Sequence, residues 1–417
     1  MSKSYFDIVI VGGGMAGSSM ALLLAQSGLK IAILEKNSYQ KKQQASFDDR
    51  CIALSWSSKK IFQKMNAWSL LEKPSNNKGN SDVLAEILDI HISDQGKMGV
   101  TRLNHLQENV AALGYVVESR ALGEVLTKQV SEQKNISIYC PARLKHMLYE
   151  HGQANLELEY RNKTKHLTTS LVIAADGAKS FGHSFLDIPP QINNYQQTAI
   201  IANVETQFPH NNIAYERFTP SGPLAMLPLT KGRCSLVWTV KEEQVDEVLG
   251  LSDDEFLTQL QQQFSYRLGN ITRTGKRFTY PLSLMKLDPD VAKKCPGLVF
   301  VGNAAHSIHP VAGQGFNLGL RDIAVLADLI EKNIQTNDGQ FLFEQSLIEQ
   351  YWELREPDIE RVGKITNNLI KIFSNERFPW TPSRNLGLIM ADIVLPLKHK
   401  IARQAMGMGI MQLRIES

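Results

Sequence analysis

The chain has 417 residues, of which 43% are hydrophobic and 21% charged, with 45 Lys and Arg against 42 Asp and Glu. This composition is typical of a soluble globular protein and excludes a disordered or collagen-like chain. The length exceeds the ~250–300 residues at which single cores stop growing, so we expect two or more domains. The net charge of +3 is too small to indicate a nucleic-acid partner.

Three features favour a reduced, cytoplasmic protein. The four cysteines lie far apart without a C-x-x-C pair, so the sequence indicates neither a zinc site nor a disulfide framework. No apolar run approaches the ~18 residues of a membrane-spanning helix. A run of three glycines, 12–14, stands where a secretory signal would place its apolar helix.

The first predicted elements are a strand over 6–11, a helix over 18–27 and a second strand over 29–34. Between the first strand and the helix, residues 12–17 read GGGMAG, which is the G-x-G-x-x-G pattern in the strand–turn–helix context that it requires. The spacing predicts a dinucleotide site, although this motif alone does not separate FAD from NAD.

The spacing also predicts what each motif residue does. Gly12 allows a tight turn, Gly14 lets the backbone approach a pyrophosphate, and Gly17 lets the helix pack closely on the strand. The start of the helix supplies N–H groups and positive potential for the phosphates. Glu35 ends the second strand and is placed to hold a ribose diol.

Two later segments extend this pattern. Residues 170–177 (SLVIAADG) predict a buried strand that runs into Asp176 and Gly177. Residues 297–302 (GLVFVG) predict another strand, followed by a glycine-rich loop and a helix. Backbone N–H groups of such a loop, placed beside a flavin ring, would stabilise the negative charge that develops on reduction.

Together these three segments resemble the cofactor motifs of the para-hydroxybenzoate hydroxylase-like flavoprotein monooxygenases, and the resemblance covers most of the chain. Within that family the chain is most similar to the ubiquinone-biosynthetic group, in the stretches 49–54, 200–204, 216–228 and 232–238. The resemblance implies an α/β fold with a Rossmann-like FAD-binding domain, an inserted β-sheet substrate domain and C-terminal helices.

The resemblance implies a division into three parts. The FAD-binding domain would be discontinuous, and its pieces would be 1–75, 105–185 and 276–345. Residues 76–104 and 186–275 would form the substrate domain. The sheet of that domain is expected to contain strands at 195–204, 214–218, 222–228 and 234–240, followed by a helix over 251–264. Residues 346–417 would form a C-terminal helical region, with breaks at Pro379, Pro382 and Pro396.

The resemblance implies non-covalently bound FAD and assigns residues to it. The expected cofactor-binding residues are Gly12, Gly14, Gly17, Glu35, Arg50, Arg120, Asp176, Gly177, Gly302, Asn303, Ala312, Gly313, Gln314, Gly315, Phe316 and Asn317. Arg50 and Arg120 suit a pyrophosphate because a guanidinium pairs with it in a bidentate manner. The alternative for each arginine is a surface ion pair.

Two positions depart from the family pattern. The second FAD motif usually begins Gly-Asp, whereas this chain has Gly302 and Asn303. The amide carbonyl still accepts a hydrogen bond but without charge assistance, so we expect somewhat weaker FAD binding. The Asp-Gly motif usually ends in arginine, and His183 stands here, which leaves its usual pyridine-nucleotide contacts unassigned.

The implied reaction is the hydroxylation of an aromatic ring. NAD(P)H would reduce FAD, and O2 would then form a C4a-hydroperoxide, an electrophile that attacks an electron-rich phenol. Pro310, Gly313 and Gly315 are the expected catalytic positions beside the flavin ring. No general base is identifiable, and Tyr215 and His306 are the two candidates. His306 and His309 lack a third ligand at a recognisable spacing, so we expect no metal site.

The finer resemblance implies a polyprenyl methoxyphenol substrate, hydroxylated para to its hydroxyl in ubiquinone biosynthesis. Three alternatives stay open: hydroxylation at another ring position of a polyprenylphenol or demethoxyubiquinol, a dehydrogenase that uses nicotinamide alone, and a non-catalytic flavoprotein of the biosynthetic complex. An apolar route for the isoprenoid tail would be lined by Phe218, Leu224, Met226 and Leu227, unless these residues are sheet core.

The C-terminal region predicts peripheral contact with the inner face of the cytoplasmic membrane. Residues 361–417 carry nine basic and three acidic side chains. Two apolar stretches, 386–390 and 393–395, precede Lys398, Lys400 and Arg403, an order suited to an anionic surface. The alternative is a helix packed on the FAD-binding domain. Other proteins of ubiquinone biosynthesis are further candidate partners.

Overall fold

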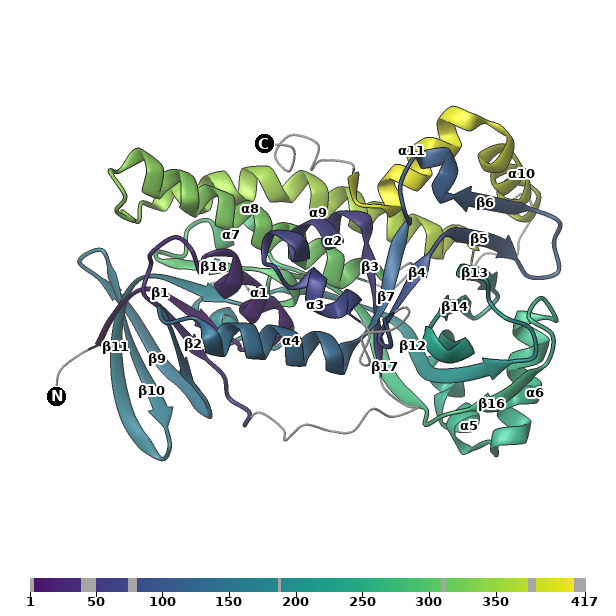
Figure 1. The fold of residues 1–417 in the computed structure, drawn as a ribbon, viewed down its shortest axis with the longest axis horizontal. Coiled ribbons are helices and arrows are strands. Elements are labelled where there is room, and N and C mark those ends of the chain that lie inside the picture. Colours follow the sequence, from purple (N-terminus) through teal and green to yellow (C-terminus); the bar gives the residue numbers. More distant parts are fainter. Residues whose placement is uncertain are drawn as a thin grey trace.

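The computed structural model describes residues 4–38, 50–73, 81–186, 189–308, 313–373 and 380–408. The molecule is elongated, with a seven-stranded sheet at one end and a nine-stranded sheet at the other (Figure 1). Two long helices, α8 (Gln314–Thr336) and α9 (Gln345–Phe373), run side by side along one edge. These features are the mixed α/β architecture that the resemblance implies.

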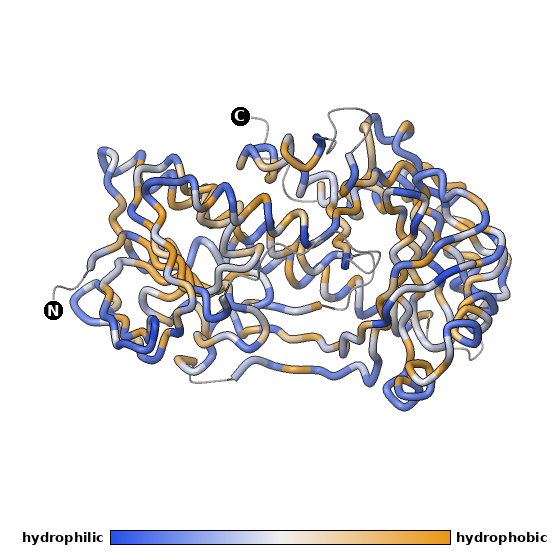
Figure 2. Tube along the Cα trace, turned by 60° about the horizontal axis from the view of Figure 1, so that its bottom comes forward, coloured by the Kyte–Doolittle hydropathy of each residue, from blue (hydrophilic) through white to orange (hydrophobic). Residues whose placement is uncertain are grey.

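The seven-stranded sheet has the order β8-β2-β1-β11-β10-β9, with β18 paired to β11. Its strands are β1 (Ser4–Val11), β2 (Ile31–Leu34), β8 (Ile136–Tyr139), β9 (Ala142–Glu150), β10 (Gln153–Tyr160), β11 (Lys163–Ala174) and β18 (Leu298–Phe300). β1, β2, β8, β11 and β18 pair in parallel. Figure 2 shows hydrophobic residues concentrated in these strands, as expected where both faces of a parallel sheet are buried.

Helices cover the parallel part of this sheet. They include α1 (Met15–Leu23), α4 (Ser119–Glu132) and α8, together with the shorter α2 (Trp56–Lys64), α3 (Trp68–Glu72) and α7 (Pro289–Ala292). The predicted helix over 18–27 is shifted: α1 begins three residues earlier, at the glycine-rich turn, and ends at Leu23. Gly28 has φ +79°, so it forms the turn into β2 and does not end the helix directly.

The nine-stranded sheet has the order β19-β17-β12-β15-β14-β13-β5-β6, with β16 paired to β12. Its strands are β5 (Asp89–Asp94), β6 (Val100–Asn104), β12 (Gln191–Thr206), β13 (Ile213–Thr219), β14 (Gly222–Pro228), β15 (Arg233–Lys241), β16 (Ile271–Thr274), β17 (Phe278–Lys286) and β19 (His306–Ser307). The helices α5 (Val245–Gly250) and α6 (Asp253–Phe264) pack on one face of it. The other face is turned towards the cavity described below.

A three-stranded sheet joins the two large ones, with the order β3 (Cys51–Ser55), β7 (Gly114–Glu118) and β4 (Leu84–Ile87). Two strands lie across the expected domain boundaries. β4 comes from 76–104 but pairs with β7, and β17 comes from 276–345 but pairs with β12. The division of the chain into domains stays a prediction, and these pairings show where its parts interlock.

The C-terminal part consists of α9, α10 (Trp380–Ile393) and α11 (Leu395–Ala405). Pro382 does not break a helix, because it lies in the first turn of α10, where a proline removes no intrahelical hydrogen bond. Pro396 does mark a break, because α10 ends at Ile393 and α11 begins at Leu395, with the proline in its first turn. Pro379 is outside the described residues. Pro357 stands inside α9, at a position where no break was expected. None of the helices in the described part of the chain combines the length and hydrophobicity that a bilayer crossing requires.

Candidate cofactor and substrate site

Strand register brings the three predicted cofactor segments to one edge of the seven-stranded sheet. Val11 at the end of β1 pairs with Ala174 of β11, which in turn pairs with Phe300 of β18. The segments that follow these strands therefore emerge side by side. Gly12, Gly14, Asp176, Gly177, Gly302 and Asn303 all line one cavity of about 1430 Å³.

The three glycines of the G-x-G-x-x-G motif have different neighbours. Gly12 has φ +105°, and a Cβ there would lie 2.6 Å from the carbonyl oxygen of Ala175. A Cβ on Gly17 would lie 1.9 Å from the carbonyl oxygen of Gly12, so the helix packs directly on the turn. A Cβ on Gly14 would meet no atom within 4 Å. The turn thus presents bare backbone to open space at Gly14, as the approach of a pyrophosphate requires.

Two acidic residues stand at the ends of these strands. Glu35 accepts hydrogen bonds from the backbone N–H of Gly13 at 2.8 Å and of Asn37 at 2.7 Å, which fixes its carboxylate beside the glycine turn. Asp176 accepts one from the N–H of Phe181 at 2.8 Å through Oδ2. Its Oδ1 is buried and has no partner among the described residues. Because an unpaired buried acceptor is costly, this oxygen fits a donor on a bound ligand, such as a sugar hydroxyl.

The start of α8 forms a third wall of the cavity. Gly313, with φ +62°, is the N-cap, and no side chain in the described part of the chain caps this helix. Gly313, Gln314, Gly315 and Phe316 line the cavity, so the N–H groups of the first turn, which have no acceptor within the helix, stand at its wall. Ala312 and Pro310 lie outside the described residues.

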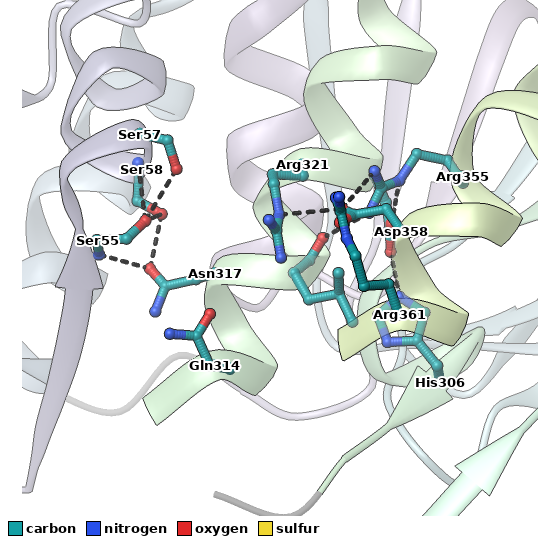
Figure 3. A network of polar contacts seen from close by, with 12 residues as sticks. Ser55, Ser57, Ser58, His306, Gln314, Asn317, Arg321, Arg355, Asp358 and Arg361 are labelled. Atoms are coloured by element: carbon teal, nitrogen blue, oxygen red, sulfur yellow. Dashed lines mark hydrogen bonds and ion pairs between the residues drawn. The ribbon is translucent and has the colours of Figure 1, made fainter. Parts of the chain in front are cut away.

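Asn317 tethers this helix start to β3 and does not line the cavity. Its Oδ1 accepts from the N–H of Ser55 at 2.8 Å and from the hydroxyl of Ser58 at 2.6 Å (Figure 3). Its Nδ2 donates to the carbonyls of Ala53 at 2.9 Å and Gly313 at 2.7 Å. Because all of these hydrogen bonds are internal, Asn317 acts on the site by holding the first turn of α8 in place.

Beyond the cofactor segments, the cavity continues between the nine-stranded sheet and the C-terminal helices. Its walls there are largely apolar. The sheet contributes Ile90, Ile92, Leu103, Ile201, Phe218, Leu227 and Val237, and the helices contribute Val362, Ile365, Leu369, Leu388, Leu397 and Ile401. Phe218 and Leu227 lie where the expected apolar route places them. Leu224 and Met226 do not, because they point to the opposite face and pack under α6.

Residues 5–362 match the family model described as a FAD binding domain. The chain belongs to this FAD-binding family. It is a flavin-dependent aromatic hydroxylase with FAD as its cofactor, and NAD(P)H is the usual electron donor of the family. The open face at Gly14, the unpaired Asp176 oxygen and the uncapped start of α8 fit this cofactor.

Similar proteins include two curated hydroxylases. The chain is 32% identical over 404 residues to "Ubiquinone hydroxylase UbiL" of Rhodospirillum rubrum, covering 96% of this chain and 89% of that one. It is 27% identical over 414 residues to "3-demethoxyubiquinol 3-hydroxylase" of Escherichia coli, covering 98% and 100%. The solved p-nitrophenol 4-monooxygenase PnpA of Pseudomonas putida shares the fold, with a TM-score of 0.77 at 14% identity over 97% of this chain and 99% of that one.

In this FAD-binding hydroxylase, His306 belongs to a buried ionic network and not to the cavity wall. Its Nε2 lies 2.6 Å from Oδ2 of Asp322, which also accepts from the N–H of Gly302 at 2.9 Å. Arg355 donates to Asp322 at 2.7 Å and to Asp358 at 2.9 Å (Figure 3). Burial opposes ionisation of Asp322, but the charges of His306 and Arg355 hold its pKa below the usual range. The network therefore holds the second cofactor segment in place at Gly302, through residues that do not line the cavity.

Neither of the expected arginines lines the cavity of the described residues. Arg50 is exposed, and its carbonyl accepts a hydrogen bond from the N–H of Ser119. Arg120 pairs with Glu118 at 3.4 Å and with Glu124 at 3.1 Å. Their contacts with FAD stay predictions.

Tyr215 is among the cavity-lining residues, yet its ring packs on the far side of the sheet. The ring centroid lies 5.6 Å from that of Phe264 in α6 and 5.6 Å from that of His91. The neighbouring Glu216 is buried and also lines the cavity. The sequence analysis assigned no role to Glu216. The signal that could have found it is the alternation of side chains along a strand, which places Tyr215 and Glu216 on opposite faces of the sheet.

Proposed function

We propose that this hydroxylase acts on a polyprenyl phenol of ubiquinone biosynthesis, as a 2-polyprenyl-6-methoxyphenol hydroxylase that oxidises the ring para to its hydroxyl. The observation that carries the proposal is the apolar extension of the cavity. The whole cavity, with the cofactor segments and this extension together, has a volume of about 1430 Å³, against ~300–1,000 Å³ for ordinary small-molecule sites. The apolar wall beyond the cofactor segments suits an isoprenoid tail, whose burial is favourable by roughly 0.8 kcal/mol per CH2.

The residues of the chain would divide the work as follows. FAD, when bound, supplies the redox and oxygen-transfer chemistry. The backbone at Gly14 and the first turn of α8 hold its negatively charged groups, while Glu35 and Asp176 accept hydrogen bonds from its hydroxyls. The apolar walls exclude water from the reacting atoms and orient the phenol.

The choice of ring position rests on resemblance and on phenol chemistry. The stretches 216–228 and 232–238 resemble the para-hydroxylating group, and a phenol oxygen donates electron density to its para carbon. A second candidate is hydroxylation at another position, as the name of the Escherichia coli relative indicates for that protein. Both candidates use the same cofactor site and differ only in how the ring is oriented.

We expect a strain that lacks this protein to accumulate a polyprenyl phenol without oxygen at the para carbon. The reason is that no later ring oxidation can proceed through the hydroquinone until this oxygen is present. Quinone intermediates would be extracted and identified by mass spectrometry, with a strain that carries the gene on a plasmid as the control. Accumulation of a demethoxy-quinone, already oxygenated para, would instead assign the chain to the sister reaction.

The same proposal includes peripheral contact with an anionic membrane through α10 and α11. Six apolar side chains of these helices and their junction are exposed by 37–68%: Leu386, Ile389, Met390, Ile393, Leu395 and Leu397. Leu397 also lines the cavity, so the exposed patch is continuous with the apolar wall. Lys400 and Arg403 are exposed on α11, which supplies positive charge beside the patch.

We expect the double variant Leu386→Ser, Ile393→Ser to lose binding to vesicles of anionic phospholipid in a flotation assay. Ile393 is 68% exposed, so its replacement removes lipid contact without opening the core. Ile192→Ser is the matched control, because Ile192 is 66% exposed on β12, outside the patch. Equal flotation of the double variant and the control would show that this patch does not bind the membrane.

A further inference from the structure

One acidic side chain interrupts the apolar sheet face of the cavity. Glu216 of β13 pairs in register with Ile92 of β5 on one side and Ala225 of β14 on the other. The row continues through Val237 of β15 to Ile201 of β12, and all five residues line the cavity. Because successive strand residues point to opposite faces, Glu216 faces the cavity while its two neighbours face α6.

Glu216 is a buried residue whose carboxyl group has no partner in the described part of the chain. The residue is 9% exposed, and it makes no hydrogen bond or ion pair with another residue in the described part of the chain. Burial raises its pKa to about 7. The nearest acid on its own sheet face, Asp94, is paired with Arg384 at 2.7 Å. A lone acid in such a wall is costly unless a ligand supplies the missing partner.

The facing elements carry few other titratable groups. Arg361 of α9 and Lys400 of α11 line the same cavity, as does Tyr280 of β17 on the sheet that carries Glu216. The other charged residues that line it lie near the cofactor segments: Glu35, Lys36, Arg143, Asp176 and Lys179. Arg361 is paired with Asp358 at 3.2 Å, which belongs to the ionic network behind α8. The two candidates of the sequence analysis are not available, because the ring of Tyr215 packs against α6 and Nε2 of His306 is bound to Asp322.

We propose that Glu216 is the general base that accepts the proton of the substrate's phenol hydroxyl; the inference rests on the proposed hydroxylation of a phenol. The phenol O–H bond breaks, and its proton passes to a carboxylate oxygen of Glu216. The electron pair raises the electron density of the ring, whose para carbon forms a C–O bond with one oxygen atom of O2 as the O–O bond breaks. The two electrons come from NAD(P)H through the bound FAD, and the second oxygen atom leaves as water. The hydrogen on the para carbon leaves as a proton, and Glu216 returns its own proton to the phenol oxygen of the product, which restores the hydroxyl and the carboxylate.

The surroundings of Glu216 suit the role of a general base. A general base works best when its pKa lies near the working pH, and such a base contributes roughly 10²–10⁴-fold to a rate. An ionised carboxylate also accepts a phenol hydrogen bond more strongly than a neutral one does. A carboxyl left unpaired in an apolar wall is thereby explained by the hydroxyl of the substrate.

The test compares Glu216→Gln and Glu216→Asp with the native holoenzyme. We expect Glu216→Gln to keep its FAD and to lose roughly 10²–10⁴-fold in kcat, together with the rise in rate through about pH 7. Glu216→Asp should retain that pH dependence. Glu205→Gln is the matched control, because Glu205 lies on the same sheet and pairs with Arg273 at 3.3 Å outside the cavity. It should behave as the native enzyme does.

A binding measurement gives a readout that does not depend on turnover. We expect 2-methoxyphenol to bind the native holoenzyme about tenfold more tightly at pH 8.5 than at pH 5.5, because the ionised carboxylate accepts its hydroxyl proton. Its affinity for Glu216→Gln should not change with pH, and 1,2-dimethoxybenzene, which has no hydroxyl, should bind all forms without pH dependence.

The outcomes separate this inference from the proposed function. If the native enzyme hydroxylates phenols and Glu216→Gln keeps both its rate and its pH dependence, the general base is another group. Only the role of Glu216 is then refuted, and the proposed function stands. If the native enzyme hydroxylates no phenol, the proposed function and the role of Glu216 fail together.

Discussion

A Gly14→Val protein is expected to fold normally and to purify without FAD. Gly14 has φ −70°, which valine adopts without strain, and an added Cβ meets no protein atom within 4 Å. The open space lies where the backbone would approach a pyrophosphate, so the valine side chain occupies the position of the phosphate oxygens. Flavin absorbance per mole of protein should fall from near one equivalent to near zero, while the circular dichroism spectrum stays unchanged.

Substitutions at two other glycines provide comparisons for this experiment. Gly123→Ala is the neutral control, because a Cβ there also meets nothing within 4 Å, and the residue lies in α4 away from the cavity. Gly17→Ala should fail to fold, because its Cβ would lie 1.9 Å from the carbonyl oxygen of Gly12. Full flavin content in Gly14→Val would mean that the phosphates lie elsewhere and that this turn only closes the fold.

The cofactor side of the site was predictable because its signals are local. Residues 12–17 carry the turn, the close approach and the helix contact within six positions, and each glycine meets the surroundings that its spacing predicts. Glu35 and Asp176 each follow a predicted strand directly, so the parallel register of β1, β2 and β11 brings them to one edge. FAD binding follows from the family to which these segments belong.

The substrate side was not predictable, because it depends on pairings between distant segments. The cavity face of β13 is set by its register with β5, which lies more than a hundred residues earlier, and a one-residue difference exchanges Tyr215 for Glu216. The same alternation sends Leu224 under α6 and Leu227 into the cavity. His306 could not be assigned either, because its partner Asp322 is held by Arg355 from another helix.

An Asp322→Ala protein is expected to lose about 3–5 kcal/mol of its free energy of unfolding, which is the usual cost of leaving a buried charge without its partner. Asp322 is fully buried and accepts from Arg355, His306 and the N–H of Gly302. Arg355 is itself 1% exposed, so among the described residues its guanidinium would keep Asp358 alone as an anionic partner. Urea unfolding of the apoprotein measures the loss.

The pKa of Asp322 adds a pH dependence to this prediction. Its neighbours hold the pKa of the folded state below the ordinary value of 3.8, so the contribution of the carboxylate is present above that value and is lost as the pH falls through the folded-state pKa. The difference in unfolding free energy between the native protein and Asp322→Ala should therefore be larger above about pH 4 than below it. It should shrink in acid.

The matched control for Asp322→Ala lies six residues further along α8. Asp328 pairs with Lys64 at 3.2 Å, but both side chains are partly exposed, so Asp328→Ala should cost no more than about 1 kcal/mol. Asp322→Ala should also weaken FAD binding, because the N–H of Gly302 loses the acceptor that fixes the second cofactor segment. Equal unfolding free energies for the two variants would mean that the buried network contributes nothing beyond a surface ion pair. Normal FAD affinity in Asp322→Ala would show that the buried ionic network does not contribute to cofactor binding.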